Sequence, residues 1–338
     1  MQLSTNVYAW NAHANVVVVD QPRTVGFSFG RGVPASTVTS SVAAAADFLV
    51  FYDGLVRLFP EFRSRALVIA GESYGGHYIP AFTGAILDRN AVAAQSSHIN
   101  LAGVLIGNGC INWTVQNTPS DTLEFQRLHN LVAPTGPIPP QFNNDSNAWM
   151  NAYLGYTPNF YDFRLQSVEC KACYGYNYSA WASWFVRADV KQALHVCGSA
   201  GDAAFTGAAG GCVPLSPFDA DDKFDYSHAL ARALEVGIPV TLYFGTADTA
   251  CNHVGGRRVA EQLVWRGGDA FRAQPMQSLS NSASADAPVA GRWKTHGGLT
   301  FIEVDAAGHM VRAVCFVLLL SSVSFFESLV ALRSRIRT

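Results

Sequence analysis

Short apolar runs alternate with segments of helical spacing along most of the chain. The runs are rich in Val, Ile and Leu and predict buried strands over residues 16–20, 66–70, 101–106, 240–244 and 300–305. Between them, apolar residues recur at helical spacing over residues 36–58, 75–87, 189–195 and 255–265. This alternation predicts an α/β fold with a mostly parallel central sheet and helices on both faces.

The alternation breaks between residues 110 and 186. This stretch is rich in Asn, Pro and aromatic residues, with a Gly-Pro-Ile-Pro-Pro segment at residues 136–140. A loop of that length without structure of its own is uncommon inside a compact domain. We therefore predict a cap subdomain over residues 111–188, inserted into an α/β domain over residues 1–312. The Ser/Ala/Asn-rich segment at residues 278–290 is expected to be a surface loop.

Composition and charge exclude several classes of protein. Of the 338 residues, 49% are hydrophobic and 14% charged, so the chain buries a large core and is not disordered. The net charge of −2 gives no indication of nucleic acid or an anionic membrane as partner. The uncharged run over residues 313–326 is shorter than the roughly 20 residues that span a bilayer. We predict an atypical hydrophobic tail over residues 313–338, and a tail anchor is the less favoured alternative.

A candidate nucleophile lies between the strand predicted at 66–70 and the helix after it. The sequence there is Gly71-Glu72-Ser73-Tyr74-Gly75, and strand, Gly-x-Ser-x-Gly, helix is the pattern of a nucleophile elbow. The elbow is a sharp, strained turn that lifts the serine hydroxyl above the sheet. Glycine is expected at both flanks because a Cβ at either one would clash with neighbouring backbone. The alternative is a serine in an ordinary glycine-rich turn.

A serine hydroxyl needs a base, and the base needs an orienting carboxylate. Asp248 directly follows the strand predicted at 240–244, and His309 follows the strand predicted at 300–305. Both therefore fall at carboxyl ends of strands, in the order Ser, Asp, His of α/β-hydrolases. The rival acid is Asp305, at the foot of the histidine's own loop, and the rival base is His296, before the last strand. Taken singly, Asp248 reads as a turn or capping residue and His309 as a structural histidine.

The sequence resembles the serine carboxypeptidases, acid-active peptidases of the α/β-hydrolase fold. The matching stretches come in family order and span most of the chain, at residues 14–22 and 26–28, 71–80, 106–109, 245–252 and 308–311. The most specific of them is the decapeptide from Gly71 to Pro80, Gly-Glu-Ser-Tyr-Gly-Gly-His-Tyr-Ile-Pro. The resemblance implies release of C-terminal residues from peptides or proteins through a covalent acyl-enzyme.

The resemblance also implies a role for each residue of the site. Ser73 would be the nucleophile, Asp248 the orienting acid and His309 the general base, and the backbone N–H of Tyr74 would supply one oxyanion-hole donor. Glu72 matches the glutamate that, kept protonated, helps to hold the C-terminal carboxylate of the substrate. Two carboxyl groups can approach each other only if they share a proton, hence the family's preference for acidic pH. The alternative is that Glu72 caps the elbow helix.

The seven cysteines bear on compartment and cofactors. By the resemblance, Cys251 matches a free cysteine near the active site, which accounts for the odd count. Cys170 and Cys173 lack the second pair that a zinc site needs, so we expect a disulfide in the cap, and no metal or cofactor. The family is secreted or vacuolar, in agreement with three glycosylation sequons at Asn112, Asn144 and Asn177. The chain opens without a signal peptide, and the sequence does not indicate an oligomeric state.

Two departures from the family pattern lead to further expectations. An Asn-Gly-Gly-Pro-Gly-Cys-Ser-Ser segment that supplies the second oxyanion donor is not found before Trp10, so leading strands are expected to be missing and Cys212 to lack its partner. After Val311 the sequence continues with Arg312 where the family has a Pro-containing turn, so an error in the gene model is expected at both ends. The alternatives to a peptidase are therefore a carboxypeptidase-like acyltransferase or esterase, and a catalytically inactive fragment.

Overall fold

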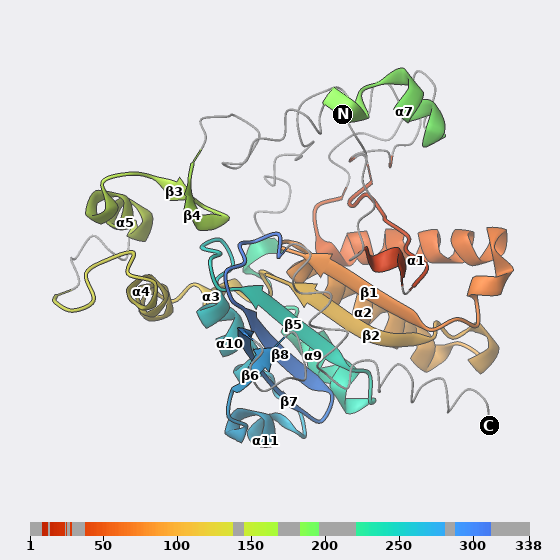
Figure 1. Cartoon of the computed structure of the whole chain (residues 1–338). Helices are drawn as coiled ribbons and strands as arrows, with labels where there is room; N and C mark the ends of the chain where they lie inside the picture. Colours follow the sequence, from red (N-terminus) through yellow and green to blue (C-terminus); the bar gives the residue numbers. More distant parts are fainter. Residues whose placement is uncertain are drawn as a thin grey trace.

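A computed structural model describes residues 9–12, 14–23, 25, 28, 38–137, 145–167, 183–195, 221–280 and 288–311. Within these residues, six strands form one sheet in the order β1-β2-β5-β8-β7-β6 (Figure 1). The first four in this order are parallel: β1 (Leu67–Glu72), β2 (Leu101–Gly107), β5 (Val240–Gly245) and β8 (Leu299–Val304). Two antiparallel strands, β7 (Val289–His296) and β6 (Gln277–Ser280), extend the sheet at one edge.

The register of the parallel strands brings their carboxyl ends together. Glu72 lies opposite Gly107, which lies opposite Tyr243, and Gly245 lies opposite Val304. Both β2 and β5 are buried along their whole length, as expected for continuous apolar runs in the middle of a parallel sheet. The loops that follow β1, β2, β5 and β8 consequently meet at one edge of the sheet, where open α/β sheets build their sites.

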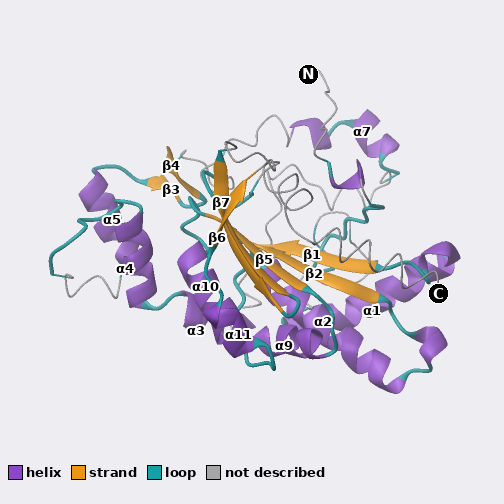
Figure 2. Ribbon diagram, turned by 60° about the horizontal axis from the view of Figure 1, so that its bottom comes forward, coloured by secondary structure: helices purple, strands orange, loops and turns teal. Residues whose placement is uncertain are grey.

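The described helices that pack on the sheet lie against one of its faces. They share the main core with the strands and are α1 (Ser41–Leu58), α2 (Gly75–Val92), α9 (Ser227–Glu235), α10 (His253–Gln262) and α11 (Gly268–Ala273). Figure 2 shows α2, α9, α10 and α11 beneath the strands. The other face carries a second cluster around Leu105, Tyr243 and Ile302, whose described partners come from strands and loops. None of the described helices contributes to that second cluster.

The segment between β2 and β5 has a small core of its own. Up to residue 195, its described elements are α3 (Trp113–Gln116), α4 (Pro119–Leu128), α5 (Ser146–Leu154), the antiparallel pair β3 (Pro158–Asn159) and β4 (Asp162–Gln166), and α7 (Ala188–Ala193). Phe125, Met150 and Phe163 pack together there with Val254 of α10. The cap boundaries at residues 111 and 188 remain a prediction, and the tail at 313–338 lies outside the described residues.

The first predicted strand is wrong. Residues 16–20 form no strand in the structure, and the side chain of Val18 is 86% exposed. A β-branched run has strand propensity, but a strand also needs a neighbour that takes its backbone hydrogen bonds, and residues 16–20 pair with no described strand.

Other predicted boundaries shift for local reasons. Helix α1 begins at Ser41 and not at residue 36, because the Ser40 side chain caps it by accepting the N–H of Ala43 at 3.2 Å. The loop predicted at 278–290 is wrong at both ends, which belong to β6 and β7, and α11 was not predicted. Short 3₁₀ turns occur at Trp10–Ala12, Pro60–Phe62, Gln95–Ser97 and Asp221–Lys223. Among the described residues, no helix has the length and apolar character needed to cross a membrane.

Candidate active site

Ser73 occupies a strained turn between β1 and α2. Its φ of +59° lies in the left-handed region, which non-glycine residues rarely adopt. Neighbouring backbone holds it there: its N–H donates to the carbonyl of Gly107 at 3.1 Å, and its carbonyl accepts the N–H of Gly76 at 2.8 Å and of Cys110 at 3.0 Å. The predicted nucleophile elbow is therefore present, and it is fixed against the loop that follows β2.

The glycines around the elbow are not equally constrained. A Cβ on Gly71 would lie 2.7 Å from the side chain of Ile79 and 3.1 Å from the Cα of Gly75. A Cβ on Gly76 would lie 2.6 Å from backbone atoms of Cys110, whereas one on Gly75 would meet nothing closer than 4.0 Å. At Gly71 the closest contact is thus with a side chain and not with the expected backbone, and Gly75 has no clash. Gly76 is the second constrained position, because the first turn of α2 presses there against the loop after β2.

Asp248 and His309 form a buried pair at the same edge of the sheet. Nδ1 of His309 lies 2.8 Å from Oδ2 of Asp248, and the two residues are 2% and 0% exposed. A carboxylate only accepts hydrogen bonds, so Nδ1 carries the proton and Nε2 is the nitrogen that can accept one. Nε2 makes no hydrogen bond to any described residue, so Ser73 and His309 are not hydrogen-bonded to each other in this structure. Such bonds are often long in the absence of substrate.

Asp248 is fixed by neighbours that prepare it to orient a histidine. Its carboxylate accepts the N–H of Ala250 at 2.9 Å and of Cys251 at 3.2 Å. Asn108, fully buried in the loop after β2, donates from Nδ2 to Oδ2 of Asp248 at 2.7 Å and accepts the N–H of Gly245 at 3.1 Å. No role was predicted for Asn108. Its position directly after a buried strand was the available signal, but its partner depends on β2 and β5 being adjacent.

The imidazole of His309 is held on its other side by Tyr161, which was not predicted either. The carbonyl of Tyr161 accepts the N–H of His309 at 2.7 Å, and the two rings stack with centroids 4.4 Å apart and planes 19° apart. Tyr161 lies in the turn between β3 and β4, far from His309 in the sequence. Nothing in the local sequence around Tyr161 could have indicated this contact.

The remaining predicted residues lie at the same edge. Glu72 is the last residue of β1 and is partly buried, and Tyr74 is the N-cap of α2. The rivals are placed differently: Asp305 is exposed, and His296 lies opposite Leu299, at the amino end of β8. Of the five predicted site residues, the structure therefore joins Asp248 and His309 by a hydrogen bond and places Glu72, Ser73 and Tyr74 on the elbow.

A buried carboxylate anchors the side chain of Tyr74. Oδ2 of Asp221 accepts hydrogen bonds from the hydroxyl of Tyr74 at 3.1 Å, and from both the N–H and the hydroxyl of Ser41 at 3.0 and 2.6 Å. Oδ1 accepts the hydroxyl of Tyr226 at 2.5 Å, and burial together with this hydrogen bond raises the pKa of Tyr226. His77, on α2, stacks on Tyr74.

The prediction of a free thiol at Cys251 is wrong. Cys251 forms a disulfide with Cys110, and their Cα atoms are 5.6 Å apart, within the usual range. The two cysteines follow β2 and β5, which are neighbours in the sheet, so parallel pairing brings their loops together. Because Cys110 also binds the carbonyl of Ser73 and Cys251 binds Asp248, the disulfide joins the elbow to the acid.

A second buried ionisable group lies apart from the Asp248–His309 pair. Glu303 of β8 is fully buried, with Oε1 3.0 Å from Nδ1 of His253 and Oε2 2.8 Å from Arg292. Burial alone raises the pKa of Glu303, but His253 and the guanidinium groups of Arg292 and Arg257 outweigh it and lower the pKa. His129 lies 3.0 Å from His253, and burial together with that neighbour lowers the pKa of His129 to about 4.

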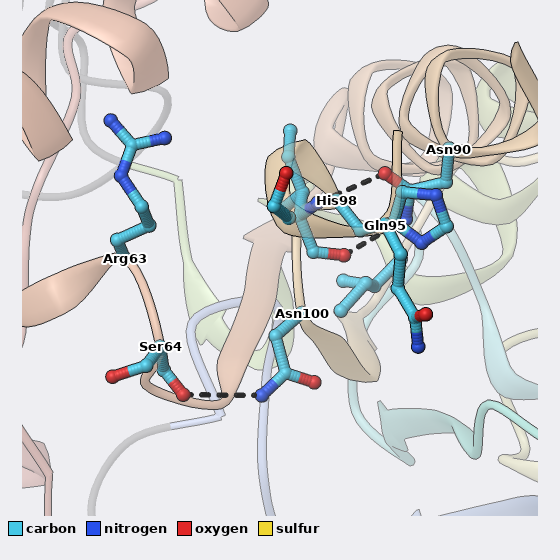
Figure 3. Close-up of a pocket in the computed structure, with 9 residues that line it drawn as sticks. Arg63, Ser64, Asn90, Gln95, His98 and Asn100 are labelled. Carbon is cyan, nitrogen blue, oxygen red and sulfur yellow. Dashed lines mark hydrogen bonds between the residues drawn. The ribbon is translucent and has the colours of Figure 1, made fainter. Parts of the chain in front are cut away.

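The open pocket in Figure 3 is not part of this edge. Its volume is about 470 Å³ and its polar lining comes from residues such as Arg63, Ser64, His98 and Asn100. Ser64 and Asn100 precede β1 and β2, so the pocket lies at the amino ends of these strands. The elbow and the acid–base pair lie at the carboxyl ends.

Several predictions concern metals, disulfides and glycosylation. The described residues contain no group of His, Cys, Asp or Glu side chains that could hold a metal ion. Cys170, Cys173, Cys212, Asn144 and Asn177 lie outside the described residues. Asn112 is 9% exposed and its side chain caps α3 by accepting the N–H of Val115, so this sequon is not presented to solvent.

The sequence is similar to those of known carboxypeptidases. Carboxypeptidase Y homolog A of Emericella nidulans is 31% identical over 344 residues, covering 90% of this chain and 58% of that protein. Serine carboxypeptidase 3 of Oryza sativa subsp. japonica is 29% identical over 334 residues, covering 92% of this chain and 64% of that protein. The chain therefore spans about three fifths of the length of these relatives.

The fold also matches a solved structure. The prohormone-processing carboxypeptidase Kex1 of Saccharomyces cerevisiae superimposes with a TM-score of 0.72 at 23% identity, covering 96% of this chain and 76% of that one. This likeness shows that the chain has the α/β-hydrolase fold of that enzyme. The sequence profile of the serine carboxypeptidases matches residues 1–135 and 139–315, which is nearly all of the described chain. The chain belongs to the serine carboxypeptidase family.

Proposed function

We propose that this protein is a serine carboxypeptidase that releases C-terminal residues from peptides and proteins. One observation carries the proposal: the buried Asp248–His309 pair lies at the sheet edge that also bears the Ser73 elbow. This is the combination that acyl transfer needs, namely an accessible hydroxyl, a base and a carboxylate that orients the base. No metal or cofactor takes part in the proposed reaction.

In the proposed mechanism, the Ser73 hydroxyl attacks the carbonyl carbon of the last peptide bond while Nε2 of His309 takes its proton. Asp248 holds the proton on Nδ1 and stabilises the imidazolium that forms. The negative charge on the carbonyl oxygen is stabilised by the backbone N–H of Tyr74 at the positive end of α2. Collapse breaks the C–N bond, His309 returns the proton to the leaving amine, and water then hydrolyses the Ser73 ester by the same steps.

Preference for the C-terminus is assigned to Glu72. It ends β1 and directly precedes Ser73, and this position beside the elbow supports the assignment. A protonated Glu72 can donate a hydrogen bond to the terminal carboxylate of the substrate, whereas two ionised carboxylates would repel each other. The proposed activity is therefore higher at acidic pH and requires a free C-terminal carboxylate.

A fluorophosphonate probe and a pair of peptides test this proposal. We expect the probe to label Ser73 in the folded protein, with no labelling of Ser73→Ala as the matched control. Hydrolysis should release the last residue from a peptide with a free C-terminus and leave its C-terminal amide intact. Absence of labelling in the folded protein contradicts the proposal. Labelling with acyl transfer to an alcohol and no peptide hydrolysis identifies an acyltransferase or esterase instead.

We further propose that the protein acts in an oxidising compartment, outside the cell or in the vacuole or lysosome. The Cys110–Cys251 disulfide supports this, since structural disulfides persist where thiols are not kept reduced. Peptide mapping of protein purified from its natural source without reductant should recover the two cysteines as one linked pair. Recovery of both as free thiols contradicts the proposed compartment.

A further inference from the structure

A short hairpin from the segment between β2 and β5 contacts both loops of the acid–base pair. The hairpin is formed by β3 and β4, residues Pro158–Gln166. Figure 1 shows it beside the loops that follow β5 and β8, at the edge of the sheet that bears the site. None of its residues was predicted to take part in the reaction. In the sequence the hairpin lies about ninety residues before the loop of Asp248 and still further before the loop of His309.

The contacts to the histidine loop are the most extensive. Tyr161 accepts the N–H of His309 at 2.7 Å through its carbonyl and stacks its ring on the imidazole. Arg164 donates to the carbonyl of Ala306 at 2.7 Å and is itself held by the buried carboxylate of Asp162 through two hydrogen bonds, at 2.8 and 2.6 Å. Ala306 has a φ of +53°, so Arg164 binds the loop where its backbone is strained.

The same hairpin also binds the loop of the acid. The N–H of Phe163 donates to the carbonyl of Ala247, adjacent to Asp248, at 3.0 Å. On the other side of the acid, the N–H of Thr249 donates to the carbonyl of Phe160 at 3.3 Å. The residues on either side of Asp248 in the chain are therefore both bonded to one hairpin, and that hairpin also bonds to His309.

Gly308 allows this close approach. A Cβ at this position would lie 2.6 Å from the carbonyl oxygen of Tyr161 and 2.8 Å from the side chain of Asp162. Any other residue would push the hairpin away from the histidine loop. The close approach of the hairpin thus requires a glycine beside His309.

We propose that the β3–β4 hairpin positions the acid and the base, and that Tyr161 is the positioning residue that fixes the ring of His309. One hydrogen bond to Asp248 leaves the imidazole free to tilt about that bond, which would move Nε2 away from the serine. The ring of Tyr161 removes this freedom by covering one face of the imidazole. Its π face also favours the imidazolium formed when His309 accepts the proton. The inference rests on the proposed peptidase function.

Kinetics of the full-length protein separate positioning from substrate contact. Because small misplacements of catalytic groups can cost about 10²-fold, we expect Tyr161→Ala to lower kcat by about that factor with little change in KM. Tyr161→Phe keeps the ring and should keep kcat within about threefold. Leu165→Ala removes an exposed side chain from the same hairpin and serves as the matched control. Unchanged kcat in Tyr161→Ala, or a raised KM alone, overturns the inference.

A spectroscopic measurement keeps the inference independent of activity. The Nδ1 proton shared with Asp248 should give a strongly downfield proton resonance that is absent from His309→Gln. We expect this resonance to broaden or shift in Tyr161→Ala and to persist in Tyr161→Phe and Leu165→Ala. A resonance identical in wild type and Tyr161→Ala overturns the positioning role. Failure of the wild type to react with fluorophosphonate while the resonance responds to Tyr161→Ala contradicts the proposed function but not the inference.

Discussion

Four of the six described non-glycine residues with positive φ lie at the edge of the sheet that bears the site. Ser73, Asn108, Ala306 and Val311 all have positive φ, between +29° and +59°, and all lie in loops after β1, β2 or β8. Backbone of this kind persists only where its surroundings hold it, and it is typical of functional sites. Hydrogen bonds from neighbouring loops supply that restraint at Ser73 and, through Arg164, at Ala306.

The elbow glycines give a prediction at the scale of single residues. We expect Gly76→Ala to abolish folding or fluorophosphonate labelling, because its Cβ would lie 2.6 Å from the backbone of Cys110. Gly75→Ala should fold and be labelled like the wild type, since nothing lies closer to its Cβ than 4.0 Å. Circular dichroism and labelling of Ser73 provide the two readouts. Equal loss in both variants would show that the motif glycine, Gly75, is constrained by something other than close approach.

At the scale of elements, a buried ionisable cluster joins a helix of the predicted cap to the sheet. His129 ends α4, His253 begins α10 and Glu303 lies in β8, and each contacts the next at 3.0 Å. Burial and the neighbouring His253 lower the pKa of His129, so a proton on His129 is disfavoured at this junction in the folded protein. Acid should therefore weaken the junction.

The pH dependence of stability tests this junction. The pKa of His129 falls from 6.5 in the unfolded chain to about 4 in the folded one. Between these values the unfolded chain binds the extra proton, so stability from His129 is complete above pH 6.5 and is lost as the pH falls through 4. We expect the free energy of unfolding, measured in urea, to depend less steeply on pH over this window in His129→Gln.

An exposed histidine provides the control for this measurement. His228→Gln alters a side chain on the surface of α9 and should leave the slope of the wild type unchanged. Parallel curves for the wild type and His129→Gln would show that His129 has no part in the acid sensitivity.

Elements with a local signal could be predicted from the sequence, and elements defined by distant partners could not. The buried runs of β1, β2, β5 and β8 and the elbow at Ser73 each carry their signal within a few residues. The short strands β3 and β6 and the run at residues 16–20 depend on whether another strand lies beside them. The same limit applies to the site: Asp248 and His309 follow predicted strands, whereas Asn108 and Tyr161 gain their roles only when distant loops meet.

At the scale of the whole molecule, one covalent bond ties two loops of the sheet edge together. Cys110 and Cys251 are separated by 141 residues in the sequence, a span that contains the predicted cap. The corresponding restraint on the unfolded chain is large, and removal of a disulfide typically costs about 2–5 kcal/mol.

We expect Cys110→Ala/Cys251→Ala to lower the free energy of unfolding by about 2–5 kcal/mol and to slow labelling of Ser73, because the elbow and the acid lose their covalent link. Chemical denaturation with and without reductant measures the first effect. The double variant is also the control, since reductant should add no further loss through this bond. Alkylation of Cys251 in the native, unreduced wild type would contradict the disulfide.

The position of β8 in the sheet has a consequence for the synthesis of the protein. This strand pairs with β5 on one side and β7 on the other, yet it is the last of the described strands along the chain. The elbow leaves the ribosome more than two hundred residues before His309 does, so a growing chain carries the proposed nucleophile without its proposed base. The Asp248–His309 pair therefore forms only once β8 has been added between β5 and β7.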